Sequence, residues 1–431
     1  MPARAATAFD AGWLASRRWF RSKQRNLVAV ELHDAARLAG SHWLLVLEAR
    51  YADGGDERYL VPAVGDGALH EPDDGEGTWL AMVAAMADGR VVDGDGSRFR
   101  FHALGEAGEL VSPLGPADER RLAVEQSNSS VRVGDRLMLK IYRLLEPGEN
   151  PELEVSRFLT AAGFRHTPGL HGWAAAEMAG TSATAAMLQE LVPARGDGWA
   201  WLLASLGAPP QGPLEALAGV AQIGGITAEM HAALASRPDD LAFPARPAEA
   251  AERRAWREAA ERELDAALAT LAEPERSRLA AVRGAVRRRF AAIEADAGVT
   301  LQRIHGDYHL GQLLRTEGGF AVVDFEGEPA RPLAERRMPA SPLRDVAGML
   351  RSLDYAVRTV ERDGPDGFDH QGWLANARAA FVAAYGGEAV AHEGLLTAFE
   401  AAKACYEVRY EASNRPDWTW LPLEALERLA P

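Results

Sequence analysis

Hydrophobic and polar positions follow a strand-like pattern in the first hundred of the 431 residues. Short apolar runs such as WLLVL (residues 43–47) and YLVP (residues 59–62) are separated by turns rich in glycine and aspartate, which predicts β-strands. A helical segment through Trp13 and Trp19 precedes them. We therefore expect residues 1–105 to form a mostly β N-terminal cap with a leading helix.

Residues 106–192 show strand alternation again. Residues 130–132 and 136–142 predict a hairpin, and a further strand is expected over residues 185–191. Asn150 followed by Pro151 predicts the start of a helix, because asparagine caps helices and proline suits the first helical position. We expect this segment to be a separate small lobe.

From residue 193 to residue 431 the pattern is mostly helical, with short strands expected only around loops at residues 301–328. Residues 247–297 read as two long helices broken near Pro274. Their arginines suggest either a phosphate-binding face or a charged outer face. Interleaved acidic residues favour the outer face. The chain as a whole is predicted to have an α+β fold.

The net charge of −15 argues against nucleic acid or an anionic membrane as the main partner, because both require basic surfaces. The single cysteine, Cys405, excludes an internal disulfide and favours a reducing compartment. No apolar run is long enough for a membrane span, and the N-terminus lacks the apolar core of a signal peptide. We therefore expect a cytoplasmic protein. Nothing in the sequence indicates an oligomeric state.

The motif HGDYHLGQ (residues 305–312), followed by DFEGEP (residues 324–329), predicts a kinase active site. Asp307 would accept the proton of the attacking hydroxyl, and Gln312 and Asp324 would hold Mg²⁺. An alternative interpretation makes His305, Asp307 and His309 a metal cluster of a hydrolase. The absence of further soft ligands nearby disfavours it.

Two acidic positions after this motif have open roles. Glu326 and Glu328 either support the metal ligands or are simply polar loop residues. Asp345 precedes an apolar helix face and either ties down the catalytic loop or stabilises the helix dipole.

Lysine is rare, since Lys23, Lys140 and Lys403 are the only three among 47 basic residues. Lys140 lies on a predicted strand whose neighbouring side chains point the other way. A kinase uses such a lysine to hold the α/β-phosphates of ATP, paired with a glutamate on the next helix. Glu154 is the first candidate for that partner and Glu152 the second. The alternative is a lysine at the sheet edge that faces solvent.

Two more segments are candidates for nucleotide contacts. The turn at residues 126–130, including Ser129, lacks glycine. Its hydroxyl and N–H groups could contact phosphates, or it could be an ordinary polar hairpin. The segment at residues 189–192 is expected to bind adenine through the backbone of Glu190 and Val192.

Residues 406–420 hold a dense group of aromatic and polar side chains near the C-terminus. Tyrosines and glutamates recur four residues apart on one helix face, and such faces either contact a sugar or belong to the core. The candidates for the acceptor site, besides Asp307 and His309, are Tyr410, Glu411, Asn414, Arg415 and Trp420.

Together these residues resemble the maltokinase family of bacterial sugar kinases, with a bilobal protein-kinase-like (aminoglycoside phosphotransferase-like) fold. The matching segments are residues 18–20, 139–142, 150–154, 305–312, 324–329, 341–346 and 410–418. The resemblance implies an N-terminal cap over residues 1–105, a small ATP-binding lobe over 106–192, a helical acceptor lobe over 193–431, and dependence on ATP and Mg²⁺.

The resemblance implies a sugar acceptor, and two candidates stay open. The C-terminal segment looks closer to the actinobacterial glucosamine kinase branch, which makes glucosamine 6-phosphate, than to maltokinases, which make maltose 1-phosphate. Glu411 with Asp417 could receive an ammonium group, and Trp420 would narrow the pocket. A catalytically inactive, sugar-binding module is the alternative of another class, and the intact Lys140 and Asp307 argue against it.

Overall fold

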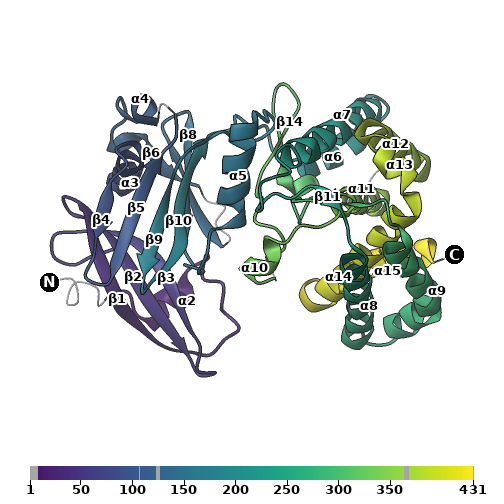
Figure 1. Cartoon of the computed structure of the whole chain (residues 1–431), viewed down its shortest axis with the longest axis horizontal. Helices are drawn as coiled ribbons and strands as arrows, with labels where there is room; N and C mark the ends of the chain where they lie inside the picture. Colours follow the sequence, from purple (N-terminus) through teal and green to yellow (C-terminus); the bar gives the residue numbers. More distant parts are fainter. Residues whose placement is uncertain (1–7, 106, 123–126, 330, 364–367, 431) are drawn as a thin grey trace. The chain divides into compact units, whose positions relative to one another are not determined.

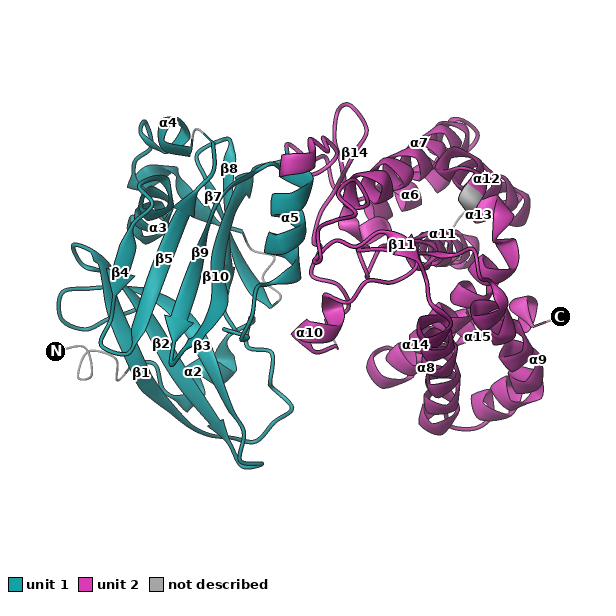
Figure 2. Ribbon diagram, viewed as in Figure 1, with its two compact units in different colours: residues 1–160, 168–192 teal, residues 161–167, 193–431 magenta. Residues whose placement is uncertain are grey.

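The computed structural model describes residues 8–105, 107–122, 127–329, 331–363 and 368–430. It divides into two compact units (Figure 2). Unit 1 comprises residues 1–160 and 168–192, and unit 2 comprises residues 161–167 and 193–431. No helix of the described residues has the length and apolar character needed to cross a membrane.

Unit 1 is built on two antiparallel sheets (Figure 1). The first has the order β1-β2-β3, formed by Leu27–Ala39, His42–Tyr51 and Asp56–Val64. The second has the order β4-β5-β9-β10-β8-β7-β6. Its strands, in chain order, are Val91–Asp93, Ser97–Ala103, Glu119–Arg121, Asn128–Val133, Leu137–Tyr142, Leu170–Met178 and Thr181–Glu190.

Helix α3 (Thr78–Ala87) joins the two sheets into one core. Trp79, Met82 and Met86 of this helix are buried in a cluster with residues from both sheets. β5 pairs with β9, so residues 97–103 share a sheet with strands that follow residue 105. The predicted separation of the cap from the small lobe at residue 105 stays a prediction.

The leading helix is α2 (Ala11–Ser16), which Asp10 caps by accepting a hydrogen bond from the N–H of Trp13; it is shorter than predicted and ends before Trp19 and Phe20. Trp19 and Phe20 are buried beside it, together with Tyr59 of β3. Two short helical segments, α4 (Ala107–Val111) and η1 (Pro116–Asp118), precede β6.

The helix predicted at Asn150 is α5 (Pro151–Ala162). The Oδ1 of Asn150 accepts a hydrogen bond of 2.8 Å from the N–H of Glu152, which is the expected capping contact. The predicted hairpin is formed by β7 and β8.

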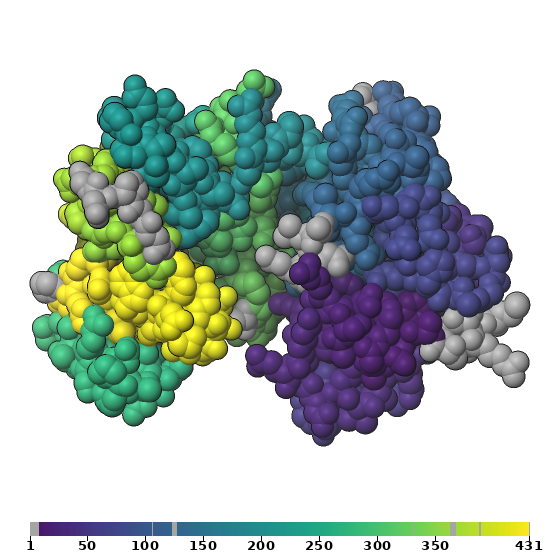
Figure 3. All heavy atoms as spheres, turned by 180° about the vertical axis from the view of Figure 1, so that it is seen from behind, coloured from purple at the N-terminus to yellow at the C-terminus, as the bar shows by residue number. Residues whose placement is uncertain are grey.

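Unit 2 is mostly helical, with two small two-stranded sheets (Figure 1). The first helices in chain order are α6 (Gly198–Leu206), α7 (Gln211–Leu234), α8 (Ala250–Thr270) and α9 (Glu275–Ala295). The later ones are α10 (Leu333–Arg336), α11 (Leu343–Asp363), α12 (His370–Tyr385), α13 (Gly387–Ala391), α14 (Glu393–Asn414), η3 (Pro416–Trp418) and α15 (Trp420–Leu429). The C-terminal helices, yellow in Figure 3, cover part of the green α8–α9 hairpin.

The small sheets frame the predicted catalytic loop. β11 (Arg246–Pro247) pairs with β12 (Thr300–Leu301), directly before the HGD motif. After the motif, the short helix η2 (Leu310–Gln312) leads into β13 (Leu313–Arg315), which pairs with β14 (Phe320–Val322). Asp307, Gln312 and Asp324 therefore lie on loops that flank paired strands of one unit.

Candidate active site

The loop that carries Asp307 is held by its own backbone N–H groups. The N–H groups of His305 and Gly306 donate to the two carboxylate oxygens of Asp345, at 2.8 and 2.9 Å. The N–H of Asp307 donates to Nδ1 of His305 at 3.4 Å. Gly306 has φ +86°, a conformation that a side chain would disfavour. Three consecutive donors and one glycine thus fix the direction of the Asp307 side chain.

Asp345 has the first of its two predicted roles, because it ties down the catalytic loop. It is buried in the first turn of α11, and its Oδ2 also lies 3.0 Å from Nε2 of His231. Burial alone would raise the pKa of Asp345, but the hydrogen bonds from His231 and from the loop N–H groups keep that pKa below its ordinary value. A charged carboxylate is therefore stable at this position.

His305 joins the loop to the strand before Asp324. Its Nε2–H donates to the carbonyl oxygen of Val323 at 3.0 Å, while its Nδ1 accepts from Asp307. Both ring nitrogens are engaged, which leaves no lone pair for a metal. The hydrolase alternative, a cluster of His305, Asp307 and His309, is disfavoured by this contact.

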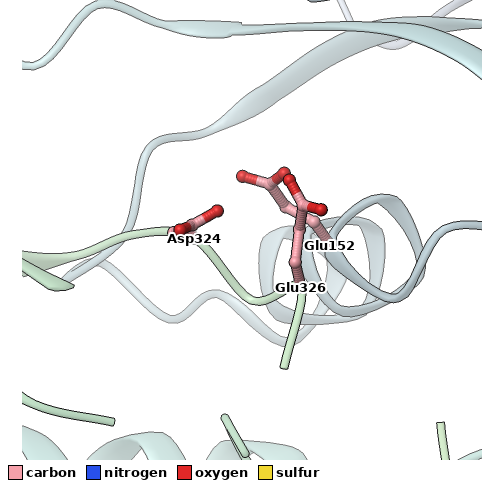
Figure 4. Close-up of side chains that lie close together, drawn as sticks. All are labelled: Glu152, Asp324 and Glu326. Carbon is pink, nitrogen blue, oxygen red and sulfur yellow. The ribbon is translucent and has the colours of Figure 1, made fainter. Parts of the chain in front are cut away.

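Gln312 and Asp324 lie side by side, with Nε2 of Gln312 3.3 Å from Oδ2 of Asp324. Figure 4 shows Asp324 and Glu326 on the loop after β14, and Glu152 on α5. Carboxylate and amide oxygens are the ligands that Mg²⁺ prefers, so this pair fits the predicted metal site. Asp324 has φ +66°, which is uncommon for a residue other than glycine.

Lys403 of α14 is a partner of Asp307 that the sequence analysis did not assign. Its Nζ lies 3.3 Å from Oδ1 of Asp307 and 3.7 Å from Oε1 of Glu328. Burial alone would lower the pKa of Lys403, but Asp307 and Glu328 raise it above its ordinary value, so the ammonium stays charged. The rarity of lysine in this chain was the signal that could have identified it.

His309 lies on the other side of the Asp307 carboxylate. Its Nδ1 accepts the N–H of Gly311 at 3.0 Å, and its Nε2 lies 4.0 Å from Oδ2 of Asp307. Burial lowers the pKa of His309, so the ring is neutral near pH 7 and carries its proton on Nε2. The predicted placement of His309 beside Asp307 matches the structure.

A cavity of about 430 Å³ opens beside Asp307 within unit 2. Its lining includes His309 and, from α14, Lys403, Tyr406, Glu407, Tyr410 and Glu411. Trp199, Tyr355, Arg415 and Trp418 complete its aromatic and charged sides. We call this space the acceptor cavity, and the residues at 403–418 that line it the acceptor wall. Of the predicted acceptor residues, Asp307, His309, Tyr410, Glu411 and Arg415 lie on this cavity.

The two glutamates of the acceptor wall have different partners. Both oxygens of Glu411 accept from Arg415, at 2.9 and 2.6 Å. In Glu407 only Oε2 accepts, from two nitrogens of the buried Arg351 at 2.9 and 2.7 Å. Burial raises the pKa of Glu407, and Arg351 offsets part of that shift. Among the described contacts, Oε1 of Glu407 is thus the wall carboxylate oxygen that stays open to a ligand.

Three residues predicted for the acceptor site do not line the cavity. Trp420 is half-buried at the start of α15, and the tryptophan on the cavity is Trp418 of η3. Asn414 is exposed and donates from Nδ2 to the carbonyl of Tyr410 at 2.8 Å. Asp417, expected to receive an ammonium, is also exposed. The reason is the turn after α14, where η3 reverses the chain and changes which side chains face inward.

In unit 1, Lys140 of β8 has a glutamate partner on α5, but it is the second of the two candidates. Nζ of Lys140 donates to Oε2 of Glu152 at 2.5 Å, and the hydroxyl of Tyr142 donates to the same oxygen at 2.7 Å. Glu154, the first candidate, is buried on the same helix, and its pairing with Lys140 stays a prediction. The solvent-facing alternative for Lys140 is excluded by this pair.

The other predicted nucleotide contacts have mixed outcomes. Ser129 is completely buried, and its Oγ accepts from Nε of Arg143 at 2.8 Å, so it supports the sheet rather than offering its hydroxyl to a phosphate. Gln126 of the same turn lies outside the described residues. Glu190 ends β10, and Val192 is the last residue of unit 1. Adenine binding by the backbone of Glu190 and Val192 stays a prediction.

Comparison with family models matches residues 118–396 to the phosphotransferase enzyme family, which is more than half of the chain. The chain is a member of the phosphotransferase enzyme family. Residues 13–94 match the maltokinase N-terminal cap domain. The predicted resemblance and the bilobal α+β fold with an N-terminal cap are thus confirmed.

Relatives of this phosphotransferase include two proteins named glucosamine kinase. The chain is 33% identical over 392 residues to the one from Streptacidiphilus jiangxiensis, covering 87% of this chain and 86% of that protein. It is 31% identical over 400 residues to the one from Mycolicibacterium smegmatis, covering 87% and 96%. A solved structure of glucosamine kinase in complex with glucosamine, ADP and inorganic phosphate is 31% identical, with a TM-score of 0.75 and coverage of 93% and 94%.

Proposed function

We propose that this phosphotransferase is a glucosamine kinase that transfers the γ-phosphoryl group of ATP to the 6-hydroxyl of glucosamine. The observation that carries the proposal is the acceptor cavity, which joins Asp307 to an acidic and aromatic wall in one unit. Aromatic faces suit the C–H surface of a sugar, and carboxylates suit its hydroxyl and ammonium groups. Two relatives that cover most of the chain carry the same activity in their names.

Asp307 is the base in this proposal. The sugar hydroxyl donates its proton to the Asp307 carboxylate while its oxygen forms a bond to the γ-phosphorus, and the bond between that phosphorus and the bridging oxygen of ADP breaks. Lys403 already occupies Oδ1 of Asp307, which directs the hydroxyl to Oδ2. Neutral His309 adds no competing charge there.

The donor-side roles are proposed for each unit separately. Lys140, held by Glu152, is suited to bind the phosphates of ATP. Gln312 and Asp324 would hold Mg²⁺, which neutralises phosphate charge when bound. Most of the rate enhancement would then come from positioning and charge neutralisation.

The ammonium of glucosamine is assigned to the open oxygen of Glu407. Glu407 lines the same cavity as Asp307, and Arg351 fixes Oε2 of its carboxylate. Glu411 is saturated by Arg415 and would instead shape the cavity. An amino sugar gains a charge-assisted hydrogen bond here that a neutral sugar lacks.

An ADP-release assay with a panel of sugars tests the proposal. Glucosamine should give the highest kcat/KM, and glucose, which lacks the amino group, a much lower one. Maltokinase activity is the second candidate function, and the match of residues 13–94 to the maltokinase cap domain favours it. The assay with maltose as acceptor tests this activity. Faster turnover of maltose than of glucosamine would overturn the acceptor, and no ADP release with any sugar would favour the inactive module.

A further inference from the structure

Unit 2 has a second cavity, of about 370 Å³. Lys403 and Tyr406 line both spaces, whereas Asp307 lines only the acceptor cavity. The volume lies in the range of about 300–1,000 Å³ that is usual for small-molecule sites. The proposed kinase reaction gives this second cavity no task.

The lining of the second cavity carries more positive than negative side chains, although the whole chain has a net charge of −15. Its lining holds five cationic side chains, Arg262, Arg331, Arg344, Lys403 and Arg409. It holds three acidic side chains, Glu263, Glu328 and Glu335. A local excess of positive charge against the overall charge of the chain indicates an anionic ligand.

Two arginines of the cavity, Arg262 and Arg344, make no side-chain hydrogen bond or ion pair with a described residue. Glu328 contacts Arg331 and Lys403, and Glu263 pairs with Arg409 at 3.1 Å. Arg344, near the start of α11, makes no side-chain hydrogen bond or ion pair with any described residue. Burial and the charge of Arg331 lower the pKa of Arg344, and the charges of Glu328 and Asp345 offset only part of that shift.

We propose that the second cavity binds a phosphoryl dianion, either inorganic phosphate or the phosphoryl group of a sugar phosphate, through Arg344 and Arg331. Guanidinium groups bind phosphate oxygens in bidentate geometry, and Arg344 has its donors uncommitted. Lys403 adds a third positive charge at the boundary with the acceptor cavity.

The remaining lining suits a sugar attached to that group. Trp256 and Phe399 pack edge to face, with ring centroids 6.3 Å apart, and both line the cavity. Tyr406 lines it as well. Aromatic faces of this kind pack on the C–H groups of a sugar ring.

The test is isothermal titration calorimetry on the full chain without ATP and with saturating glucosamine, so that the acceptor cavity is filled. Inorganic phosphate and glucosamine 6-phosphate are titrated separately. We expect binding at one site, weakened about tenfold or more by Arg344→Gln, as for the loss of a charge-assisted bidentate contact. Tighter binding of glucosamine 6-phosphate than of inorganic phosphate would identify a sugar phosphate as the ligand. Equal affinity for the two would show that the cavity recognises the phosphoryl group alone.

Arg288→Gln is the matched control, because Arg288 is exposed on α9 and lies outside both cavities. It should bind phosphate as the unaltered protein does. Arg331→Gln gives a second probe of the cavity in case Arg344→Gln lowers the melting temperature. No heat of binding with either titrant, or equal affinity in the Arg344→Gln variant, would overturn the proposal.

This test does not depend on kinase activity. Phosphate binding that needs Arg344 in a protein without sugar kinase activity would uphold the second cavity and refute the proposed function. Glucosamine phosphorylation without such binding would support the proposed function and refute the phosphate site in the second cavity.

Discussion

The catalytic loop and the acceptor wall hold their functional groups by different means. In the loop, backbone N–H groups of residues 305–307 donate to Asp345 and His305, and the chain folds tightly around one glycine. In the wall, side chains on α14 are fixed by ion pairs with Arg351 and Arg415. The loop geometry therefore depends on the backbone and on the side chains of Asp345 and His305, whereas single substitutions on α14 can change the wall.

The difference separates chemistry from specificity. Proton transfer needs one carboxylate at one place, which a rigid loop provides. Acceptor choice depends on the shape and charge of the wall, and these can vary while the loop stays constant. Substitutions in the loop should then lower kcat, and substitutions in the wall should mainly change KM and the preference among sugars.

The largest effect is expected for Asp307→Asn. The change keeps the size of the side chain and removes the base, so kcat should fall by about 10²–10⁴. ADP release with saturating glucosamine measures it, and thermal melting shows that the variant is folded. Asp265→Asn, on the exposed side of α8, is the matched control with unchanged kcat. Turnover of Asp307→Asn close to that of the control would remove Asp307 from the mechanism.

A smaller loss, about tenfold in kcat, is expected for Lys403→Met, which removes the ammonium beside Asp307. ADP release with saturating glucosamine measures the loss, and thermal melting shows that the variant is folded. Lys23→Met, at an exposed position of unit 1, serves as control. Turnover of Lys403→Met equal to that of the control would contradict the assignment.

Glu407→Gln should raise the KM for glucosamine about tenfold and leave kcat nearly unchanged, because it removes the carboxylate assigned to the ammonium. Since the pKa of Glu407 is raised, its charge is lost at a higher pH than that of an ordinary glutamate as the pH falls. The KM for glucosamine should therefore rise toward acidic pH, and this dependence should vanish in Glu407→Gln. Glucose, which has no ammonium, should show neither effect. If Glu411→Gln changed KM more than Glu407→Gln, the ammonium would belong to Glu411.

The smallest effect separates Trp418 from Trp420. Trp418→Ala widens the acceptor cavity, so the preference for glucosamine over maltose should fall by about tenfold. Trp420→Ala should leave the ratio of the two kcat/KM values nearly constant, since Trp420 does not line the cavity. Equal changes in both variants would show that the turn at η3 is not what selects the acceptor.

The sequence analysis was most successful where function depends on spacing along the chain. Gln312 and Asp324 are close in sequence and stand on either side of the paired strands β13 and β14, so their meeting followed from local structure alone. The fold class and the kinase family were predicted from these motifs and are confirmed by the family match.

The errors occur where side-chain direction depends on helix phase or on a turn. Lys140 pairs with Glu152, which the sequence ranked second, and the role of Glu154, which it ranked first, stays a prediction. Trp418 and Trp420 are two residues apart, and the 3₁₀ turn at η3 decides which one faces the cavity. Lys403 was missed because its partner Asp307 lies 96 residues away in sequence. Such pairs follow from the packing of helices, which local patterns do not encode.

The left-handed backbone conformation of Asp324 lowers the stability of the fold at a residue that is proposed to serve catalysis. A glycine would adopt φ +66° with less strain, and each such strained residue costs on the order of 1–3 kcal/mol. Selection for a more heat-resistant protein would therefore favour the loss of the carboxylate proposed to hold the metal, while selection for catalysis retains it. Attempts to engineer a thermostable form of this chain should leave position 324 unchanged and seek their gains elsewhere.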